Sequence, residues 1–351
     1  MTRAQIASCP GSPSPYEDSM HHVVIFTNHI VWVPAILIRA TLEALAPCED
    51  VKLTAICMPE LQGFKRALLK HYMREAVLSV GSLFKTAVKH HHTCPLPINL
   101  NHCARRHRFR ILVPPEGNIN HPDFIEYLRV KFHPTIALSF YCTQKFSSDL
   151  LGVFSHAVNY HNGILPEYRG LGATEWSIYQ QNEETGFTFH RMTENIDAGN
   201  ILIEETISVD PESTLFDLEL EKGIAAARQI SRLLRMITNG DQGRPQRGDG
   251  RYFSRADCLA VKRISDPSII SSTEITNRLR AFGCLEIKIA EKWHSVTKIK
   301  QLLDGRGCTS PLCFRTCDGV ILKPVGFIHL PYKMYRFLKW CAGWLRRKRG
   351  S

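Results

Sequence analysis

The sequence predicts an α/β protein with a mostly parallel β-sheet, followed by a smaller β-rich unit. Through residue 238, apolar runs of strand length alternate with segments of helical spacing, an order typical of parallel sheets covered by helices. The polar, glycine-rich stretch at residues 239–250 has no periodicity and is interpreted as a linker. A length of 351 residues allows two domains or so, with a sizeable buried core.

The elements of the first part follow from local patterns. The first strand is expected at residues 23–26, where an apolar run ends before Thr27. Pro34 suits the first turn of a helix, which we expect over residues 35–45. The same reasoning predicts strands at 51–57, 110–113, 135–141, 187–192 and 201–209, and helices at 64–88, 122–132 and 213–237. These elements together predict one domain over residues 21–238.

The remaining segments are interpreted from composition. Residues 1–20 are rich in Ser and Pro and lack an apolar run, so we expect a disordered leader rather than a secretory signal. Residues 251–330 are expected to form the small domain, with a capped helix at 273–282 and short strands at 286–290, 312–316 and 320–325. The turn Cys317-Asp318-Gly319 indicates that the last two strands form a hairpin. The patterns assign no role to residues 58–108.

Polar side chains follow the strand that is predicted to end near residue 158. Asn159 and His161 are two residues apart, so in extended chain both leave the same side. Asp197 stands in a turn ahead of Ala198-Gly199. An amide, an imidazole and a carboxylate can donate to an oxyanion, exchange a proton near neutral pH and orient the imidazole. Taken singly, each residue also has a structural explanation, as a hydrogen-bonding His, a turn Asn or a turn-capping Asp.

These residues belong to a longer pattern that resembles the 10-formyltetrahydrofolate-dependent formyltransferases. That family includes the methionyl-tRNA, glycinamide ribonucleotide and nucleotide-aminosugar formyltransferases. Its usual form is Asn-x-His-x-Ser-Leu-Leu-Pro-x-x-Arg-Gly, followed by Trp, Thr-Gly-x-Thr and Asp-x-Gly. The matches here, in the same order, are Asn159, His161, Ile164, Leu165, Pro166, Tyr168, Arg169, Gly170, Trp176, Thr185, Gly186, Thr188, Asp197 and Gly199. Gly163 stands where the family usually has Ser.

The resemblance implies a Rossmann-like formyltransferase fold with a barrel-like C-terminal domain. It implies transfer of a formyl group from 10-formyltetrahydrofolate to a primary amine, without a metal. Asn159 and His161 would donate to the oxyanion, and Asp197 would orient His161 and accept the proton of the amine. Gly163, Ile164, Leu165 and Pro166 would contact the folate. Arg169 and Gly170 are candidates for substrate binding, although Arg169 is equally suited to brace the loop.

The amine acceptor is left open by the sequence. The basic charge and the second C-terminal unit favour methionyl-tRNA slightly. Against this, residues 172–176 lack the proline of most tRNA-using relatives, and residues 188–192 resemble the enzymes that use amino sugars. Two further alternatives are hydrolysis of the folate donor to formate and a catalytically silent protein that binds RNA or a membrane surface.

Positive charge is concentrated in two stretches of a chain with a net charge of +11. No acid lies between residues 76 and 115 or between 333 and 349. Their basic residues are Lys85, Lys89, Arg105, Arg106, Arg108 and Arg110 in the first stretch and Lys333, Arg336, Lys339, Arg346, Arg347, Lys348 and Arg349 in the second. Residues 331–351 are expected to form an amphipathic tail helix that can contact RNA, an anionic membrane or its own domain.

Other classes of site have little support. His90, His91, His92, Cys94, His102, Cys103 and His107 match no standard zinc spacing. We interpret this segment as a solvated basic loop. The motifs for nucleotide phosphates and dinucleotides are absent from the sequence. The 12 cysteines are scattered, which favours a reduced, cytoplasmic setting, and no apolar run is long enough to span a bilayer.

Overall fold

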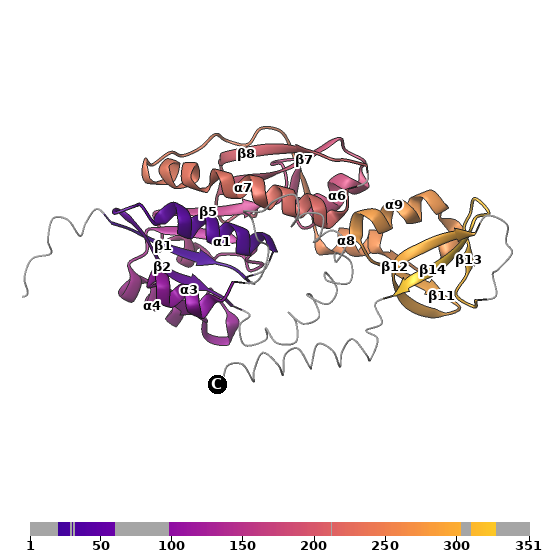
Figure 1. Ribbon diagram of the computed structural model, residues 1–351, viewed down its shortest axis with the longest axis horizontal. Coiled ribbons are helices and arrows are strands. Elements are labelled where there is room, and N and C mark those ends of the chain that lie inside the picture. The colour runs from indigo at the N-terminus through magenta and orange to yellow at the C-terminus, as the bar shows by residue number, and fades with distance from the viewer. Residues whose placement is uncertain are drawn as a thin grey trace, which may run out of the picture. The chain divides into compact units, whose positions relative to one another are not determined.

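The computed structural model describes residues 20–59, 98–302 and 310–327, apart from residues 29, 31 and 212 (Figure 1). The described chain divides into two compact units. The first runs to Thr174 and resumes over Glu183–Phe253, and the second comprises Glu175–Asn182 and the chain from Ser254. Three expectations lie outside the described residues: the leader apart from Met20, the helix at residues 64–88 and the basic tail helix with its anionic contact.

The first unit contains a seven-stranded sheet in the order β3-β2-β1-β4-β5-β7-β8. Its strands are β1 (His21–Phe26), β2 (Val51–Cys57), β3 (Arg110–Leu112), β4 (Ile136–Phe140), β5 (His156–His161), β7 (Glu184–Arg191) and β8 (Ile201–Ser208). The first five are parallel, whereas β7 is antiparallel to both β5 and β8. The predicted α/β class with a mostly parallel sheet is therefore confirmed.

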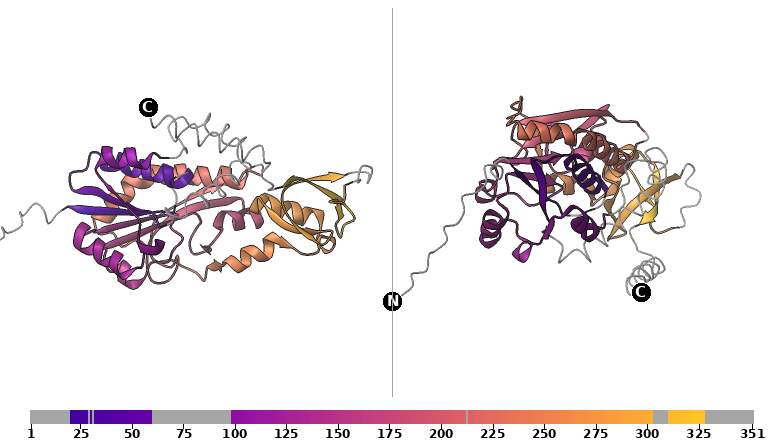
Figure 2. Two further views of the ribbon diagram at one scale, coloured as in Figure 1. Left: turned by 90° about the horizontal axis from the view of Figure 1, so that it is seen from below. Right: turned by 60° about the vertical axis from the view of Figure 1, so that its left-hand side comes forward.

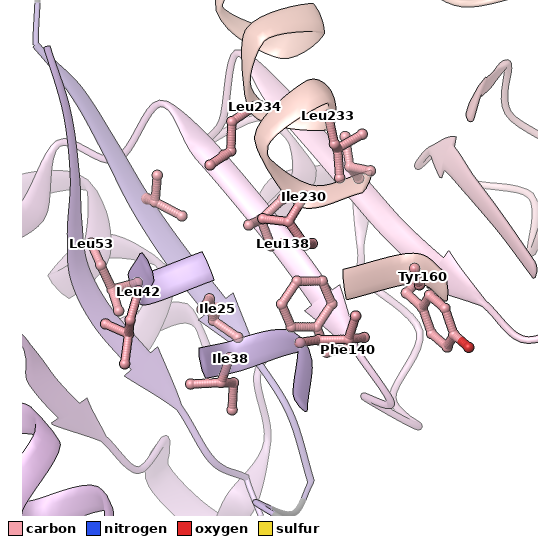
Figure 3. Close-up of a cluster of buried hydrophobic side chains, with 14 of the residues drawn as sticks. Ile25, Ile38, Leu42, Leu53, Leu138, Phe140, Tyr160, Ile230, Leu233 and Leu234 are labelled. Atoms are coloured by element: carbon pink, nitrogen blue, oxygen red, sulfur yellow. The ribbon is translucent and has the colours of Figure 1, made fainter. Parts of the chain in front are cut away.

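Alternation along β1 assigns helices to the two faces of this sheet. Val23 and Ile25 point into a cluster with α1 (Trp32–Leu45), α3 (Leu100–His107) and α7 (Leu215–Thr238). The cluster is drawn in Figure 3, where side chains of α1 and α7 meet the strands; its labelled residues are Ile25, Ile38, Leu42, Leu53, Leu138, Phe140, Tyr160, Ile230, Leu233 and Leu234. Burial of this apolar surface stabilises the arrangement.

The opposite face carries a second cluster. Val24 and Phe26 point into it and meet α4 (Pro122–Phe132) and α5 (Ser148–Leu151). Figure 2 (left) shows helices on both sides of the strands of this unit. Because β1 is buried on both faces, its sequence reads as a continuous apolar run, as expected for a central parallel strand.

Helix α7 begins and packs in ways that its sequence explains. Thr214 accepts from the backbone amide of Asp217, and the Asp217 side chain accepts from the backbone amide of Thr214, which forms a capping box. A Cβ on Gly223 would lie 2.8 Å from Cγ1 of Val33, so glycine is needed for α1 to approach α7 this closely. These features fix where α7 begins and how closely it packs against α1.

The predicted linker at residues 239–250 is not a free connection. Arg244 exchanges two backbone hydrogen bonds with Ile201, each of 2.8 Å. Beyond it, β9 (Arg251–Phe253) pairs with β6 (Tyr168–Gly170) in a two-stranded sheet. These pairings include residues 239–253 in the first unit, which ends at Phe253. The sequence did not indicate this boundary, because pairings between distant residues leave no local pattern.

The second unit is built around a five-stranded sheet in the order β10-β11-β12-β14-β13. Its elements after α6 (Ala173–Tyr179), which continues from the first unit, are α8 (Arg255–Lys262), β10 (Arg263–Ile264), a 3-10 turn (Pro267–Ile269), α9 (Ser272–Phe282), β11 (Leu285–Ile289), β12 (Lys292–Leu302), β13 (Phe314–Arg315) and β14 (Ile321–Phe327). The predicted hairpin is present as β13 and β14. The longest strand, β12, was not predicted because Val296 is its only buried residue.

The segment interpreted as a basic loop contains a helix where it is described. Helix α3 begins after Asn99, whose side chain accepts from the amide of His102. Arg105, Arg108 and Arg110 line a surface hollow at the amino-terminal end of β3. Within the described ranges, no three His, Cys, Asp or Glu side chains converge as metal ligands, and no helix is long and apolar enough to cross a membrane.

We expect Gly250→Ala to lower the free energy of unfolding by about 2 kcal/mol, as overpacking of a close contact does. A Cβ at this position would lie 1.8 Å from the carbonyl oxygen of Pro166. Gly248→Ala is the control, because a Cβ there meets nothing within 4 Å and adds only the strain of its positive φ. Urea denaturation of both variants measures the difference. Equal, small effects would mean that residues 239–250 are a free linker.

Candidate active site

The carboxyl end of β5 presents the amide and the imidazole that the sequence placed there. Asn159 lies beside Ser139 of β4 and directly opposite His190 of β7, and His161 ends the strand. The amide nitrogen of Asn159 is 3.2 Å from Nε2 of His190. The antiparallel pairing of β5 with β7 therefore brings a second imidazole to the strand end.

Asp197 lies in the turn between β7 and β8, and its carboxylate is directed at both imidazoles. Oδ2 is 3.5 Å from Nδ1 of His161, and Oδ1 is 3.4 Å from Nε2 of His190. The backbone amide of Gly170 also donates to Oδ2, over 2.8 Å. Asp197 adopts a φ of +52°, a left-handed conformation that aspartate tolerates better than most residues. The predicted residues thus gather around one buried carboxylate.

Hydrogen bonding fixes which nitrogen of His161 carries its proton. Nε2 lies against the carbonyl oxygen of Tyr168, and a carbonyl can only accept, so Nε2–H donates to it. Nδ1 of neutral His161 therefore presents a lone pair to Asp197 at 3.5 Å. This His161–Asp197 pair has room for one additional proton.

His190 was not among the predicted site residues, although it lies in the run at residues 188–192 that resembles the enzymes using amino sugars. Its Nδ1–H donates to the carbonyl oxygen of Arg191 over 2.8 Å. Its Nε2 accepts from Asn159 when neutral and donates to Asp197 when protonated. His190 reaches the site only through the register in which β5 pairs with β7. This register cannot be predicted from a single sequence.

Burial is the largest influence on both titrating groups of the pair. Burial lowers the pKa of His161, and this outweighs the opposing attraction of Asp197. Burial alone would raise the pKa of the Asp197 carboxyl, but His161, His190 and the Gly170 amide hold it well below its usual range. At neutral pH, Asp197 is therefore ionised and the neutral form of His161 is favoured.

The segment predicted to contact folate, Gly163 to Pro166, is held from inside the protein. The hydroxyl of Thr188 donates to the carbonyl oxygen of Gly163 over 2.7 Å and accepts from the amide of Leu165 over 3.3 Å. Leu165 is 2% exposed, so its side chain packs inward. A Cβ on Gly163 would lie 2.4 Å from that of Ala173, so the serine usual in the family would displace its neighbours. Folate contact by this segment stays a prediction.

Arg169 and Gly170 have structural partners in the described chain. The guanidinium of Arg169 donates to Oε1 of Gln246 through Nε and Nη2, over 3.2 and 2.8 Å. Gln246 in turn donates to the carbonyl oxygens of Asp197 and Gly199, each over 2.8 Å. Arg169 therefore braces the Asp197 turn through Gln246, which sequence reasoning missed. Contact of Arg169 or Gly170 with a substrate stays a prediction.

Residues 120–229 match the family model described as formyl transferase. The matched segment begins just before α4, ends within α7 and contains Asn159, His161 and Asp197. The family resemblance drawn from the sequence is therefore confirmed for this segment.

Curated relatives include the GDP-perosamine N-formyltransferases of Brucella melitensis biotype 1 and Brucella abortus. Each is 33% identical to this chain over 163 residues, which is 46% of this chain and 61% of the relative. The match thus spans less than two thirds of either relative.

Solved structures of similar fold include a sugar N-formyltransferase from a Shewanella species, with a TM-score of 0.54 and 16% identity over 89% of this chain and 100% of that one. A second is an N-formyltransferase from Helicobacter canadensis in complex with folinic acid and dTDP-3-aminofucose. Its TM-score is 0.54 at 18% identity, over 87% of this chain and 98% of that one. At these identities the likeness shows the fold, and it agrees with the predicted class.

We expect the free energy of unfolding to fall as the pH decreases from 7 to 5. His161, His22 and His156 all have a pKa lowered chiefly by burial, so below about pH 6.5 the unfolded chain binds protons that the folded chain excludes. Above that pH the folded and unfolded imidazoles are both neutral and no stability is lost. The depressed pKa of Asp197 adds a further loss only below about pH 4.

Urea denaturation at a series of pH values measures this slope, to which one excluded proton contributes at most about 1.4 kcal/mol per pH unit. His161→Gln should reduce the slope, and His102→Gln, at an exposed position of α3, serves as the control. An unchanged slope in His161→Gln would show that the buried imidazole is protonated in the folded state.

Proposed function

We propose that this chain, which carries the formyl transferase segment, transfers a formyl group from 10-formyltetrahydrofolate to the amino group of a nucleotide-linked amino sugar. The observation that carries the proposal is the gathering of Asn159, His161 and Asp197 at the carboxyl ends of the strands, where open α/β sheets bind ligands. The family match over residues 120–229 supports formyl transfer as the chemistry.

The folate donor is supported by the inner face of the loop and by a structural relative. The hydroxyl of Thr188 forms hydrogen bonds with the backbone of Gly163 and Leu165 and so fixes the position of this loop beside the catalytic side chains. The Helicobacter canadensis structure contains folinic acid. We place the donor along Gly163, Ile164, Leu165 and Pro166.

The reaction exchanges one carbon–nitrogen bond for another. The amine nitrogen attacks the formyl carbon and forms a new C–N bond, and a tetrahedral oxyanion develops. The bond from that carbon to N10 of the folate then breaks. The amine loses one proton and N10 gains one, so the reaction balances without an oxidant or a water molecule. The protein must stabilise the oxyanion and carry this proton.

Asn159 is the principal oxyanion donor in this proposal. One hydrogen of its amide nitrogen faces His190, and the second is free to donate to the developing oxygen. The single hydrogen of neutral His161 already donates to Tyr168, so His161 stabilises the oxyanion only by sharing that hydrogen.

The His161–Asp197 pair receives the proton of the amine. The 3.5 Å separation of Nδ1 and Oδ2 leaves a place for it, and the ionised carboxylate stabilises the imidazolium that forms. Release of the proton to N10, directly or through water, returns the pair to its starting state.

Amino sugars are preferred to methionyl-tRNA as acceptors. The curated relatives are named GDP-perosamine N-formyltransferases, and the structural relatives include a sugar N-formyltransferase. The slight preference for methionyl-tRNA, which rested on the basic charge and the second C-terminal unit, has no support from these comparisons. The run at residues 188–192 was the sequence signal for an amino-sugar acceptor.

Parallel assays of the full chain test the proposal. Purified protein with 10-formyltetrahydrofolate is offered GDP-perosamine, dTDP-3-aminofucose, methionyl-tRNA or no amine, and products are identified by mass spectrometry. We expect a gain of one formyl group on an amino sugar. Formylation of methionyl-tRNA alone, formate release without any amine, or the absence of folate binding would each overturn the proposal and point to the corresponding alternative.

We expect Asn159→Ala and His161→Ala each to lower kcat by about 10² to 10³, because the first removes the principal oxyanion donor and the second removes the proton acceptor. Asn101→Ala and His102→Ala are matched controls, because both positions are exposed on α3. Steady-state kinetics and thermal unfolding of all four variants separate catalysis from folding. Wild-type kcat in either folded site variant would refute the assigned roles.

A further inference from the structure

A fully buried ammonium group lies next to the candidate site and takes no part in the proposed chemistry. Lys222, on α7, is 0% exposed. Its Nζ donates to the carbonyl oxygen of Asn162 over 2.7 Å, to the hydroxyl of Thr174 and to the hydroxyl of Thr185 over 3.3 Å. A buried charge is costly, and these three partners compensate it only in part, so its presence next to the site calls for an explanation.

Glu219, one turn earlier on α7, completes the arrangement. Its Oε1 accepts from the side-chain amide of Asn162 over 2.7 Å and from the hydroxyl of Thr174, and its Oε2 accepts from the hydroxyl of Tyr141. Thr174 thus accepts from Lys222 and donates to Glu219. We refer to Tyr141, Asn162, Thr174, Thr185, Glu219 and Lys222 as the Lys222–Glu219 network.

Tyr141 enters this network from a strained backbone. It directly follows β4 and has a φ of +59°, a conformation that is unusual for an aromatic residue. Its ring stacks on that of Tyr160, with centroids 5.8 Å apart and planes at 24°. Strain of this kind persists where the surrounding structure over-determines it, and it concentrates at functional sites.

The network holds both ends of the segment that organises the catalytic groups. Asn162 follows His161 directly, and Thr174 closes the segment at α6. Between them, the carbonyl of Tyr168 accepts from His161 and the amide of Gly170 donates to Asp197. A displacement of either end would therefore move the groups that orient His161 and Asp197.

The network also acts on the site through charge. The charged or titrating groups that influence His161 are Asp197, His190 and Lys222. Burial has the largest effect on the pKa of His161, and the ammonium of Lys222 lowers it further. Replacing a buried charged group by an apolar side chain often leaves stability unchanged or improves it, so stability alone does not account for Lys222.

We propose that Lys222 and Glu219 are positioning residues, which hold residues 162–174 so that His161, Tyr168, Gly170 and Asp197 keep the geometry needed for proton transfer. This inference rests on the proposed formyl transfer for its kinetic consequences. Its structural consequence, the ordering of residues 162–174, is independent of any substrate.

Lys222→Met tests the proposal, with Arg228→Met, an exposed cation on the same helix, as the matched control. We expect Lys222→Met to lower kcat by about 10²-fold, the scale of a misplacement of about 1 Å at a reacting centre. KM for the folate donor should rise as well, because its proposed contacts, Gly163 to Pro166, lie within residues 162–174. The acidic limb of the kcat/KM profile should move to higher pH, since His161 loses a neighbouring positive charge.

The double variant Lys222→Met/Glu219→Gln keeps the test decisive if the single variant does not fold. It removes both charges while residue 219 still accepts hydrogen bonds. We expect it to unfold cooperatively, with low kcat and with faster amide hydrogen exchange over residues 162–174 in the absence of substrate. Wild-type kcat and wild-type exchange in this folded variant would overturn the proposal.

The exchange measurement distinguishes this failure from failure of the proposed function. A wild-type protein that formylates no amine would refute formyl transfer. Faster exchange in the variant would still support the positioning role, and unchanged exchange would refute it.

Discussion

The site depends on one constraint, the placement of the Asp197 carboxylate in a left-handed turn. This carboxylate meets His161 from β5, His190 from β7 and the amide of Gly170 from β6. Its own carbonyl is held by Gln246. These groups come from segments far apart in the sequence, and the carboxylate is the point at which they meet. Because it is ionised and buried, its partners must remain in place to compensate the charge.

The change from parallel to antiparallel pairing at β5 is what gives the site its second imidazole. A parallel neighbour would present the end of another strand that runs the same way, as β4 does with Ser139. The antiparallel β7 instead places His190 directly opposite Asn159. Helix α7 serves both the core and the site: Ile230 and Leu233 pack in the apolar cluster, whereas Glu219 and Lys222 reach the loop after β5.

Within the described part of the first unit, one basic cluster lies at the opposite end of the strands from the candidate site. Asn159 and His161 stand at the carboxyl ends of the parallel strands, while Arg110 begins β3 and lines a hollow with Arg105 and Arg108 at the other end. This cluster therefore gives no direct information about the acceptor at the candidate site.

The sequence by itself determined the features that local patterns encode. The predicted strand at residues 51–57 and helix at 122–132 match β2 and α4 in both bounds, because burial and capping act within a few residues. The sequence also identified Asn159, His161 and Asp197 as candidate site residues, through their order in the motif. Only the tertiary structure decided the role of His190, the attachment of residues 239–250 and the contact of Arg169 with Gln246. These depend on strand register and on contacts between residues 31 to 77 positions apart, which no local periodicity specifies.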